Sequence, residues 1–181
     1  MDEDRHYLGE YADAFRALAA RTPHEAHQDA FERFANGAIE AELGMVHDHY
    51  QHQEGAYHTK KRLPTTLAYC RFLRHHTANQ PVAVGMASML PCAWMYSELG
   101  LHMARHATPN NPYSRWFEAY ASPGFARDVQ HEIDILTHYA ALHPEHREEM
   151  MHAFFTSCWH EEQFWEGAYH HPLQHKKHRP G

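Results

Sequence analysis

Several features that would assign a chain to a specialised class are missing from this sequence. Its 181 residues include three cysteines (Cys70, Cys92 and Cys158) and no Cys-x-x-Cys pair, so neither a disulfide framework nor a zinc-binding thiol cluster is indicated. No apolar run approaches the roughly 20 residues of a membrane helix. The acidic start, MDEDRHYLGEY, lacks the apolar stretch of a signal peptide. We therefore expect a reduced, cytoplasmic protein with no membrane partner.

Positive charge is also scarce. Lys and Arg number 16 against 23 Asp and Glu, which gives a formal net charge of −7 with neutral histidine. Binding to a phosphate backbone depends on clustered Lys and Arg, and no basic recognition helix stands out, so we expect no nucleic-acid partner. Most of the 21 histidines lie in polar stretches and are expected to be solvated. Residues 171–181, rich in His and Lys, are expected to form a flexible tail whose spacing specifies no metal geometry.

Helical periodicity, in contrast, is present over almost the whole length of the chain. Four helices are expected to begin at the prolines Pro64, Pro81, Pro123 and Pro144, because proline is tolerated at a helix start. A longer one is expected from about Pro23 to His52, with Leu43 and Val46 facing inward and Gly55 beyond its end. No stretch alternates with period two for long enough to indicate a strand. We predict one all-α domain of about seven helices over residues 1–170.

One proline, Pro91, falls inside an expected helix rather than at its start. There it removes one hydrogen bond and bends the helix axis directly before Cys92. A lone cysteine on an apolar helix is usually a small core residue, so Cys92 alone does not define a site. Tyr96 lies one turn further along on the same face. A buried tyrosine needs a hydrogen-bond partner, so this face is a candidate site.

Two adjacent glutamates, Glu161 and Glu162, lie among aromatic residues near the end of the chain. Both could be solvated. Their aromatic neighbours Phe155, Phe164 and Trp165 instead favour one carboxylate held in a dry pocket, where its pKa would be raised. A carboxyl group of this kind suits proton transfer near neutral pH.

Five segments that span most of the chain resemble, in order, the motifs of the TenA/thiaminase II family. The central segment contains Leu-Pro-Cys followed by an aromatic pair, and the last contains Glu-x-x-Phe-Trp-x-x-Ala-Tyr. The first departs from the family pattern because Glu3 stands where the family has glutamine. The segments are Asp4–Leu8, Pro64–Tyr69, Ser88–Tyr96, Asn111–Tyr120 and Glu161–Tyr169.

The resemblance implies a haem-oxygenase-like helical bundle that hydrolyses a thiamin-related aminopyrimidine, either 4-amino-5-aminomethyl-2-methylpyrimidine or thiamin itself. It implies that Cys92 is the nucleophile and that Glu161, three residues before Phe164, donates protons. Asp4 would hold the amino edge of the pyrimidine and Phe164 would stack on its ring. Hydrogen bonds and shape would come from four tyrosines, Tyr7, Tyr69, Tyr96 and Tyr120. No metal or organic cofactor is implied, and the family resemblance implies a homo-oligomer, a tetramer.

The resemblance leaves three points open. The family has a further helix before its first motif, whereas this sequence starts at Met1, so we expect that helix to be missing and apolar surface to be exposed. A di-iron oxidase on the same fold is an alternative, since Glu40 and His47 have suitable spacing, although His160 is followed four residues later by Phe164 rather than by a ligand. A non-enzymatic pyrimidine-binding protein is the other alternative.

Overall fold

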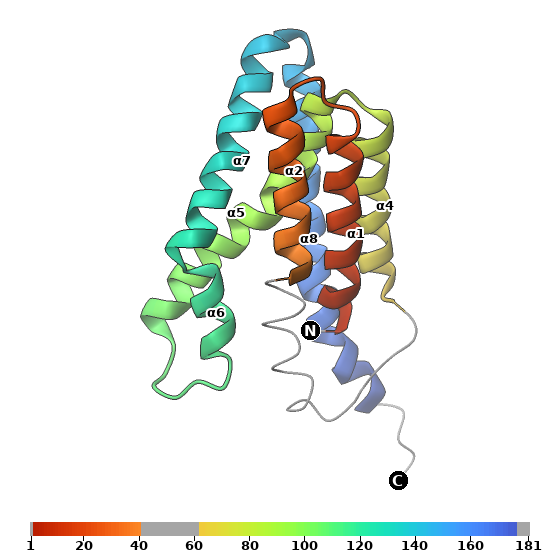
Figure 1. Cartoon of the computed structure of the whole chain (residues 1–181). Coiled ribbons are helices and arrows are strands. Elements are labelled where there is room, and N and C mark those ends of the chain that lie inside the picture. Colours follow the sequence, from red (N-terminus) through yellow and green to blue (C-terminus); the bar gives the residue numbers. More distant parts are fainter. Residues whose placement is uncertain (1, 41–61, 177–181) are drawn as a thin grey trace.

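The computed structural model describes residues 2–40 and 62–176, and seven α-helices account for most of these ranges (Figure 1). No strand occurs within them, as predicted. One short 3₁₀ helix precedes the last α-helix. The elements are α1 (Asp2–Ala19), α2 (Glu25–Gly37), α4 (Pro64–Asn79), α5 (Val82–His106), α6 (Ser114–Tyr120), α7 (Pro123–Leu142), η2 (Pro144–His146) and α8 (Arg147–Lys176).

The prolines mark the helix starts as the sequence predicts. Pro64 and Pro123 occupy the first turns of α4 and α7, Pro81 is the residue before α5, and Pro144 begins η2, which leads into α8. The prediction for the second helix is confirmed only to Gly37, since Leu43, Val46, His52 and Gly55 lie outside the described residues. The backbone of α8 continues to Lys176, past the predicted helix end near Tyr169.

Helix α5 is the central element of the fold. It packs against α4, α6, α7 and α8 and also contacts α1, which in turn packs against α2 and α4. In Figure 1, α1, α2, α4 and α8 stand side by side, whereas α6 and α7 lie to the left of this group. Fully buried apolar side chains such as Phe15, Leu18, Leu73 and Met86 fill the space between the helices. A site residue on α5 is therefore surrounded by other helices.

Two glycines of α5 allow its neighbours to approach closely. A Cβ atom at Gly85 would lie 2.8 Å from Leu18 Cδ2, and one at Gly100 would lie 2.7 Å from Tyr120 Cβ and 2.9 Å from the Ala121 nitrogen. Such distances are shorter than van der Waals contact, so the bare glycine backbone is needed at Gly100 for α6 to sit where it does. This contact sets the position of Tyr120.

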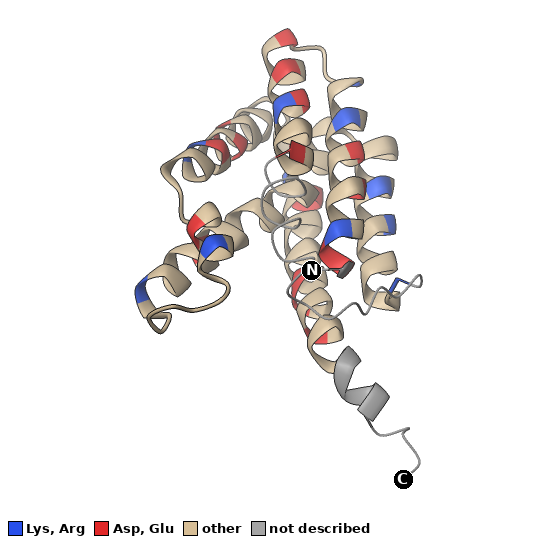
Figure 2. Cartoon of the chain, turned by 60° about the horizontal axis from the view of Figure 1, so that its bottom comes forward, with Lys and Arg blue, Asp and Glu red and all other residues tan. Residues whose placement is uncertain are grey.

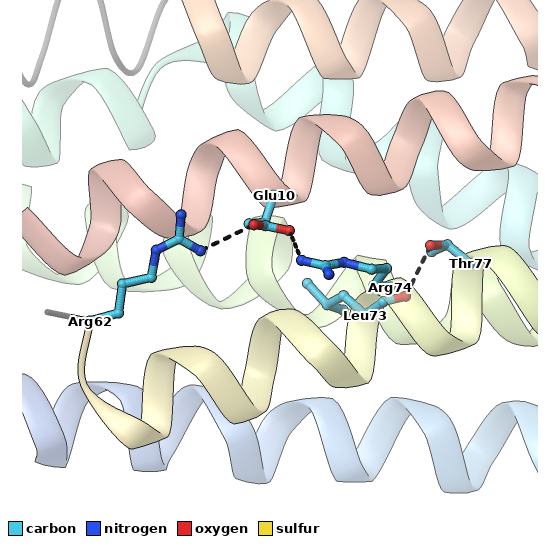
Figure 3. A network of polar contacts seen from close by, with 5 residues as sticks. All are labelled: Glu10, Arg62, Leu73, Arg74 and Thr77. Atoms are coloured by element: carbon cyan, nitrogen blue, oxygen red, sulfur yellow. Dashed lines mark hydrogen bonds and ion pairs between the residues drawn. The ribbon is translucent and has the colours of Figure 1, made fainter.

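Ion pairs at the surface of the bundle tie α1 to α4 and to the segment just before it. Glu10 bonds Arg62 (3.1 Å) and Arg74 (2.5 Å), and Figure 3 shows its carboxylate between the two guanidinium groups. Burial opposes ionisation of Glu10, but hydrogen bonds from the two arginines hold its pKa below the ordinary value. Elsewhere on the described helices, basic and acidic residues are interspersed (Figure 2). No helix in the described part of the chain is long and apolar enough to cross a membrane.

Candidate active site

All eight residues that the sequence analysis assigned to the site are buried. They come from five helices, α1, α4, α5, α6 and α8, which all pack around or near the middle of α5. Their exposed fractions are Asp4 7%, Tyr7 2%, Tyr69 1%, Cys92 6%, Tyr96 5%, Tyr120 2%, Glu161 1% and Phe164 5%. Burial of so many polar side chains is costly unless they interact with one another.

The turn of α5 that precedes Cys92 is held by hydroxyl groups from two other helices. Pro91 lies inside α5, as predicted, and has no N–H to contribute to the helix. In this turn the Tyr11 hydroxyl donates to the Met89 carbonyl (3.2 Å) and Ser157 Oγ donates to the Ser88 carbonyl (2.7 Å). These cross-helix bonds fix the backbone that carries the cysteine.

Glu161 is the buried member of the glutamate pair, whereas Glu162 is exposed. Tyr69 donates a hydrogen bond to Glu161 Oε1 at 2.8 Å, and the Cys92 thiol also hydrogen-bonds this carboxyl group. The pKa of Glu161 is raised from its ordinary value of 4.5 to about 7. Burial is the largest cause and the charge of the nearby Asp4 adds to it, while the hydrogen bonds from Tyr69 and Cys92 act in the opposite direction. The group is thus poised to exchange a proton near neutral pH.

The aromatic surroundings of Glu161 differ from those expected. Phe155 is 62% exposed and Trp165 is 41% exposed, so the expectation that both line a dry pocket is wrong. Phe155 lies six residues before Glu161, and at 100° per residue this places it on a distant face of α8. Trp165 contacts the Tyr96 ring with its centroid 5.6 Å away. Tyrosines from other helices enclose the carboxyl group instead.

Two of these tyrosines, Tyr7 and Tyr69, form the wall behind the cysteine. The Tyr7 ring stacks on Tyr69 with centroids 4.8 Å apart and also approaches Phe164 at 5.6 Å. Burial raises the pKa of Tyr7, Tyr69 and Tyr96 well above the ordinary value, so their hydroxyls stay protonated. The buried Tyr7 hydroxyl lies near that of Tyr69 but makes no hydrogen bond of regular geometry with the described residues.

Asp4 lies near the start of α1 and contacts Tyr96. Its Oδ1 accepts a hydrogen bond from the Tyr96 hydroxyl at 3.4 Å, and the Tyr96 ring meets the edge of Tyr120 with centroids 5.0 Å apart. This contact joins α1, α5 and α6. Because carboxylate oxygens accept hydrogen bonds, Asp4 could bind an amino group or a protonated ring nitrogen.

A cavity of about 370 Å³ reaches Cys92 from the side of α2, α6 and α7. Its size falls within the range of about 300–1,000 Å³ that is typical of small-molecule sites. Four of the eight predicted residues line it: Asp4, Cys92, Tyr96 and Tyr120. The other four, Tyr7, Tyr69, Glu161 and Phe164, are not among its lining residues and form a packed layer that contacts Cys92 through Glu161. The cysteine therefore lies between the cavity and the packed layer that contains Glu161.

Several lining residues were not predicted from the sequence. Tyr11 and Phe15 extend the face of Tyr7 by one and two turns, a spacing that could have revealed them. Glu132 of α7 is 4% exposed and lies three residues after the buried Val129, so a carboxylate on an inward face was also visible. Ser157, which bonds Tyr69 and the Ser88 carbonyl but does not line the cavity, gave no signal, because a small hydroxyl residue in a helix has no distinctive pattern.

The described residues contain no group of three His, Cys, Asp or Glu side chains placed to hold a metal ion. Glu40, one ligand of the di-iron alternative, is exposed, and His47 lies outside the described residues. His160 is buried but stacks on Tyr69 with centroids 5.2 Å apart. Within the described part of the chain, the residues named for that alternative do not meet.

The arrangement of helices places the chain in a known class of all-helical proteins. A TenA homologue from P. horikoshii aligns with a TM-score of 0.77 and 18% identity, over 91% of this chain and 78% of that one. A TenA family transcription regulator from a Silicibacter species gives a TM-score of 0.81 and 17% identity, over 91% of this chain and 77% of that one. These likenesses show the TenA-like fold.

Residues 2–171 match the TENA/THI-4/PQQC family, and the chain belongs to it. The aminopyrimidine aminohydrolase of Bacillus subtilis is 28% identical over 174 residues, which cover 92% of this chain and 72% of that protein. The thiamine biosynthesis multifunctional protein ThiED of Corynebacterium efficiens is 28% identical over 169 residues, which cover 93% of this chain. The chain spans 23% of that protein and 22% of the ThiED protein of Corynebacterium glutamicum.

Proposed function

We propose that this protein hydrolyses a thiamin-related aminopyrimidine, with Cys92 as the nucleophile and Glu161 as the group that moves protons. The observation that carries the proposal is the buried Cys92–Glu161 hydrogen bond at the edge of a cavity that also contains Asp4. A family relationship to an aminopyrimidine aminohydrolase supports the choice of substrate class.

The first step would be formation of a thiolate. Glu161 accepts the Cys92 proton, and the sulfur then adds to an electron-poor carbon of the pyrimidine ring. Addition breaks the aromaticity of the ring, so the bond between the exocyclic methylene and its nitrogen can break. The leaving amine takes the proton held by Glu161. A displacement that is slow in one step is thereby divided into two faster ones.

Water completes the reaction. Its oxygen bonds to the methylene carbon, one of its protons returns to the enzyme, and the carbon–sulfur bond breaks to regenerate the thiolate. Asp4 would hold the amino edge of the ring from within the cavity. Tyr96 and Tyr120 would supply hydrogen bonds and shape from the same cavity, while Tyr7, Tyr69 and Phe164 would support the ring from the layer behind Cys92.

The proposal is tested by incubating the purified protein with 4-amino-5-aminomethyl-2-methylpyrimidine and, separately, with thiamin, both in ¹⁸O-labelled water. Mass spectrometry should detect hydroxymethylpyrimidine that carries one labelled oxygen, and comparing the two rates identifies the preferred substrate. If isothermal calorimetry detects binding of the pyrimidine but no product forms, the non-enzymatic alternative replaces the proposal. If neither binding nor conversion occurs, the substrate class is wrong.

A further inference from the structure

A line of buried polar groups connects the turn before Cys92 to Glu161, on the side away from the cavity. Ser157 Oγ lies 2.7 Å from the Ser88 carbonyl oxygen and 2.9 Å from the Tyr69 hydroxyl, which lies 2.8 Å from Glu161 Oε1. Ser157 is fully buried, and Tyr69 and Glu161 are each 1% exposed. The line thus contains three short contacts in a region of low dielectric constant, where hydrogen bonds that polarise one another are strengthened.

The number of protons in this line depends on the state of Glu161. Each hydroxyl group donates one proton, and a carbonyl oxygen donates none. When Glu161 is ionised, Tyr69 donates to it, and Ser157 donates either to Tyr69 or to the Ser88 carbonyl. One of the three contacts then has no proton. When Glu161 is protonated, it donates to Tyr69, Tyr69 donates to Ser157, and Ser157 donates to the carbonyl, so all three contacts are hydrogen bonds.

We propose that Ser157 is a positioning residue that acts through Tyr69 to favour the protonated form of Glu161. The effect on turnover rests on the proposed function, but the proton balance is a property of the protein without substrate. In the protonated state, the carboxyl group can still accept the hydrogen bond from the Cys92 thiol. Ser157 therefore helps to keep a proton beside the nucleophile, where the leaving amine needs it.

Other groups around Glu161 also act on its pKa. The charge of Asp4 on α1 raises the pKa of Glu161, and the hydrogen bond from Cys92 on α5 lowers it. Tyr7 of α1, Tyr69 of α4, Tyr96 of α5 and Cys158 of α8 all interact electrostatically with its charge. Ser157 carries no charge, so replacing it tests the hydrogen-bond line separately from these groups.

The test is an infrared titration of the substrate-free protein, in which the band that disappears in Glu161→Gln is assigned to Glu161. Ser157→Ala should lower the pKa of Glu161 by about half to one unit, which corresponds to the net effect of one hydrogen bond. Ser157→Thr, which keeps the hydroxyl, should titrate as the wild type does. An unchanged or raised pKa in Ser157→Ala overturns the proposal, and this holds even if the protein turns over no substrate.

Thr77→Val is a matched control for the loss of a buried hydroxyl. Thr77 is also fully buried and its hydroxyl bonds a helix carbonyl, that of Leu73, but it is no part of the line (Figure 3). This variant should leave the pKa of Glu161 unchanged. If Ser157→Ala does not fold, Ser157→Cys, a weaker donor of similar size, should give a smaller shift in the same direction.

A double-mutant cycle checks the route of the effect. Tyr69→Phe removes the hydroxyl between Ser157 and Glu161, so Ser157→Ala should cause no further shift in that background. An equal shift with and without the Tyr69 hydroxyl would mean that Ser157 acts by another route, which contradicts the proposal. If turnover is observed, the acid limb of the pH profile of kcat/KM should move with the infrared pKa.

Discussion

At the residue scale, Cys92 and Glu161 share a hydrogen bond inside a region that holds almost no exposed polar surface. A thiol is a weak nucleophile until it loses its proton, and burial alone makes that loss harder. Glu161, with its pKa raised to about 7, is the nearby group able to accept the proton and release it again. One proton can therefore pass between the two groups, and because they interact, their titration is a property of the pair.

Glu161→Gln should reduce turnover far more than Glu162→Gln. The first removes a group that moves protons, which typically contributes 10²- to 10⁴-fold, whereas Glu162 is exposed and should change the rate by no more than about twofold. Steady-state kinetics of both variants on the better pyrimidine substrate provide the comparison. A larger loss in Glu162→Gln would show that the wrong glutamate has been assigned.

Glu161→Gln should also make the protein more stable at high pH. The pKa of Glu161 is about 7 in the folded state against 4.5 as the ordinary value, so the folded state binds more protons between these values and stability falls as pH rises through them. The shift corresponds to about 3 kcal/mol, which is lost by pH 8. Urea unfolding of Glu161→Gln should therefore give a flatter pH dependence and a higher free energy of unfolding at pH 8. A variant less stable than the wild type at pH 8 would contradict the assignment.

At the element scale, the close approach of α5 and α6 places Tyr120 beside Tyr96. Gly100→Ala would put a methyl group 2.7 Å from Tyr120 Cβ and 2.9 Å from backbone atoms of α6, so the two helices must separate. We expect a net loss of about 1–2 kcal/mol, because overpacking outweighs the better helix propensity of alanine, together with weaker substrate binding. Chemical denaturation and KM measure the two effects.

Gly9→Ala is the control for that substitution. A Cβ atom at Gly9 meets nothing within 4 Å, and the residue lies inside α1, so alanine should stabilise the protein by about 0.5–1 kcal/mol. A loss of stability in Gly100→Ala together with a gain in Gly9→Ala would support close packing as the cause. Equal effects at both would mean that the α5–α6 contact is looser than the structure indicates.

At the scale of the whole molecule, the helix starts could be predicted because proline and apolar periodicity act locally. Pro64, Pro81, Pro123 and Pro144 mark boundaries that depend on the backbone of a few neighbouring residues. The choice between Glu161 and Glu162 came from the family resemblance, since the residues alone left both open. The inward position of Glu161 follows from tyrosines on α1, α4 and α5, which no local pattern identifies.

The rest depended on packing between distant helices. The expectation that Phe155 surrounds Glu161 was wrong because Phe155 lies on an outward face of α8. Met151, four residues before it, and Trp159, four residues after it, are exposed on the same face. Exposed apolar patches of this kind mark interaction surfaces. The homo-oligomer that the family resemblance implies stays a prediction.

The most direct test of the account is turnover and binding by Cys92→Ser. A hydroxyl is far less nucleophilic than a thiolate at neutral pH, so the rate of hydroxymethylpyrimidine formation should fall by roughly 10³-fold or more. Calorimetry should still detect binding of the pyrimidine, because Asp4, Tyr96 and Tyr120 are unchanged. Cys70→Ser and Cys158→Ser should keep the wild-type rate. Wild-type turnover by Cys92→Ser would contradict covalent catalysis at this site.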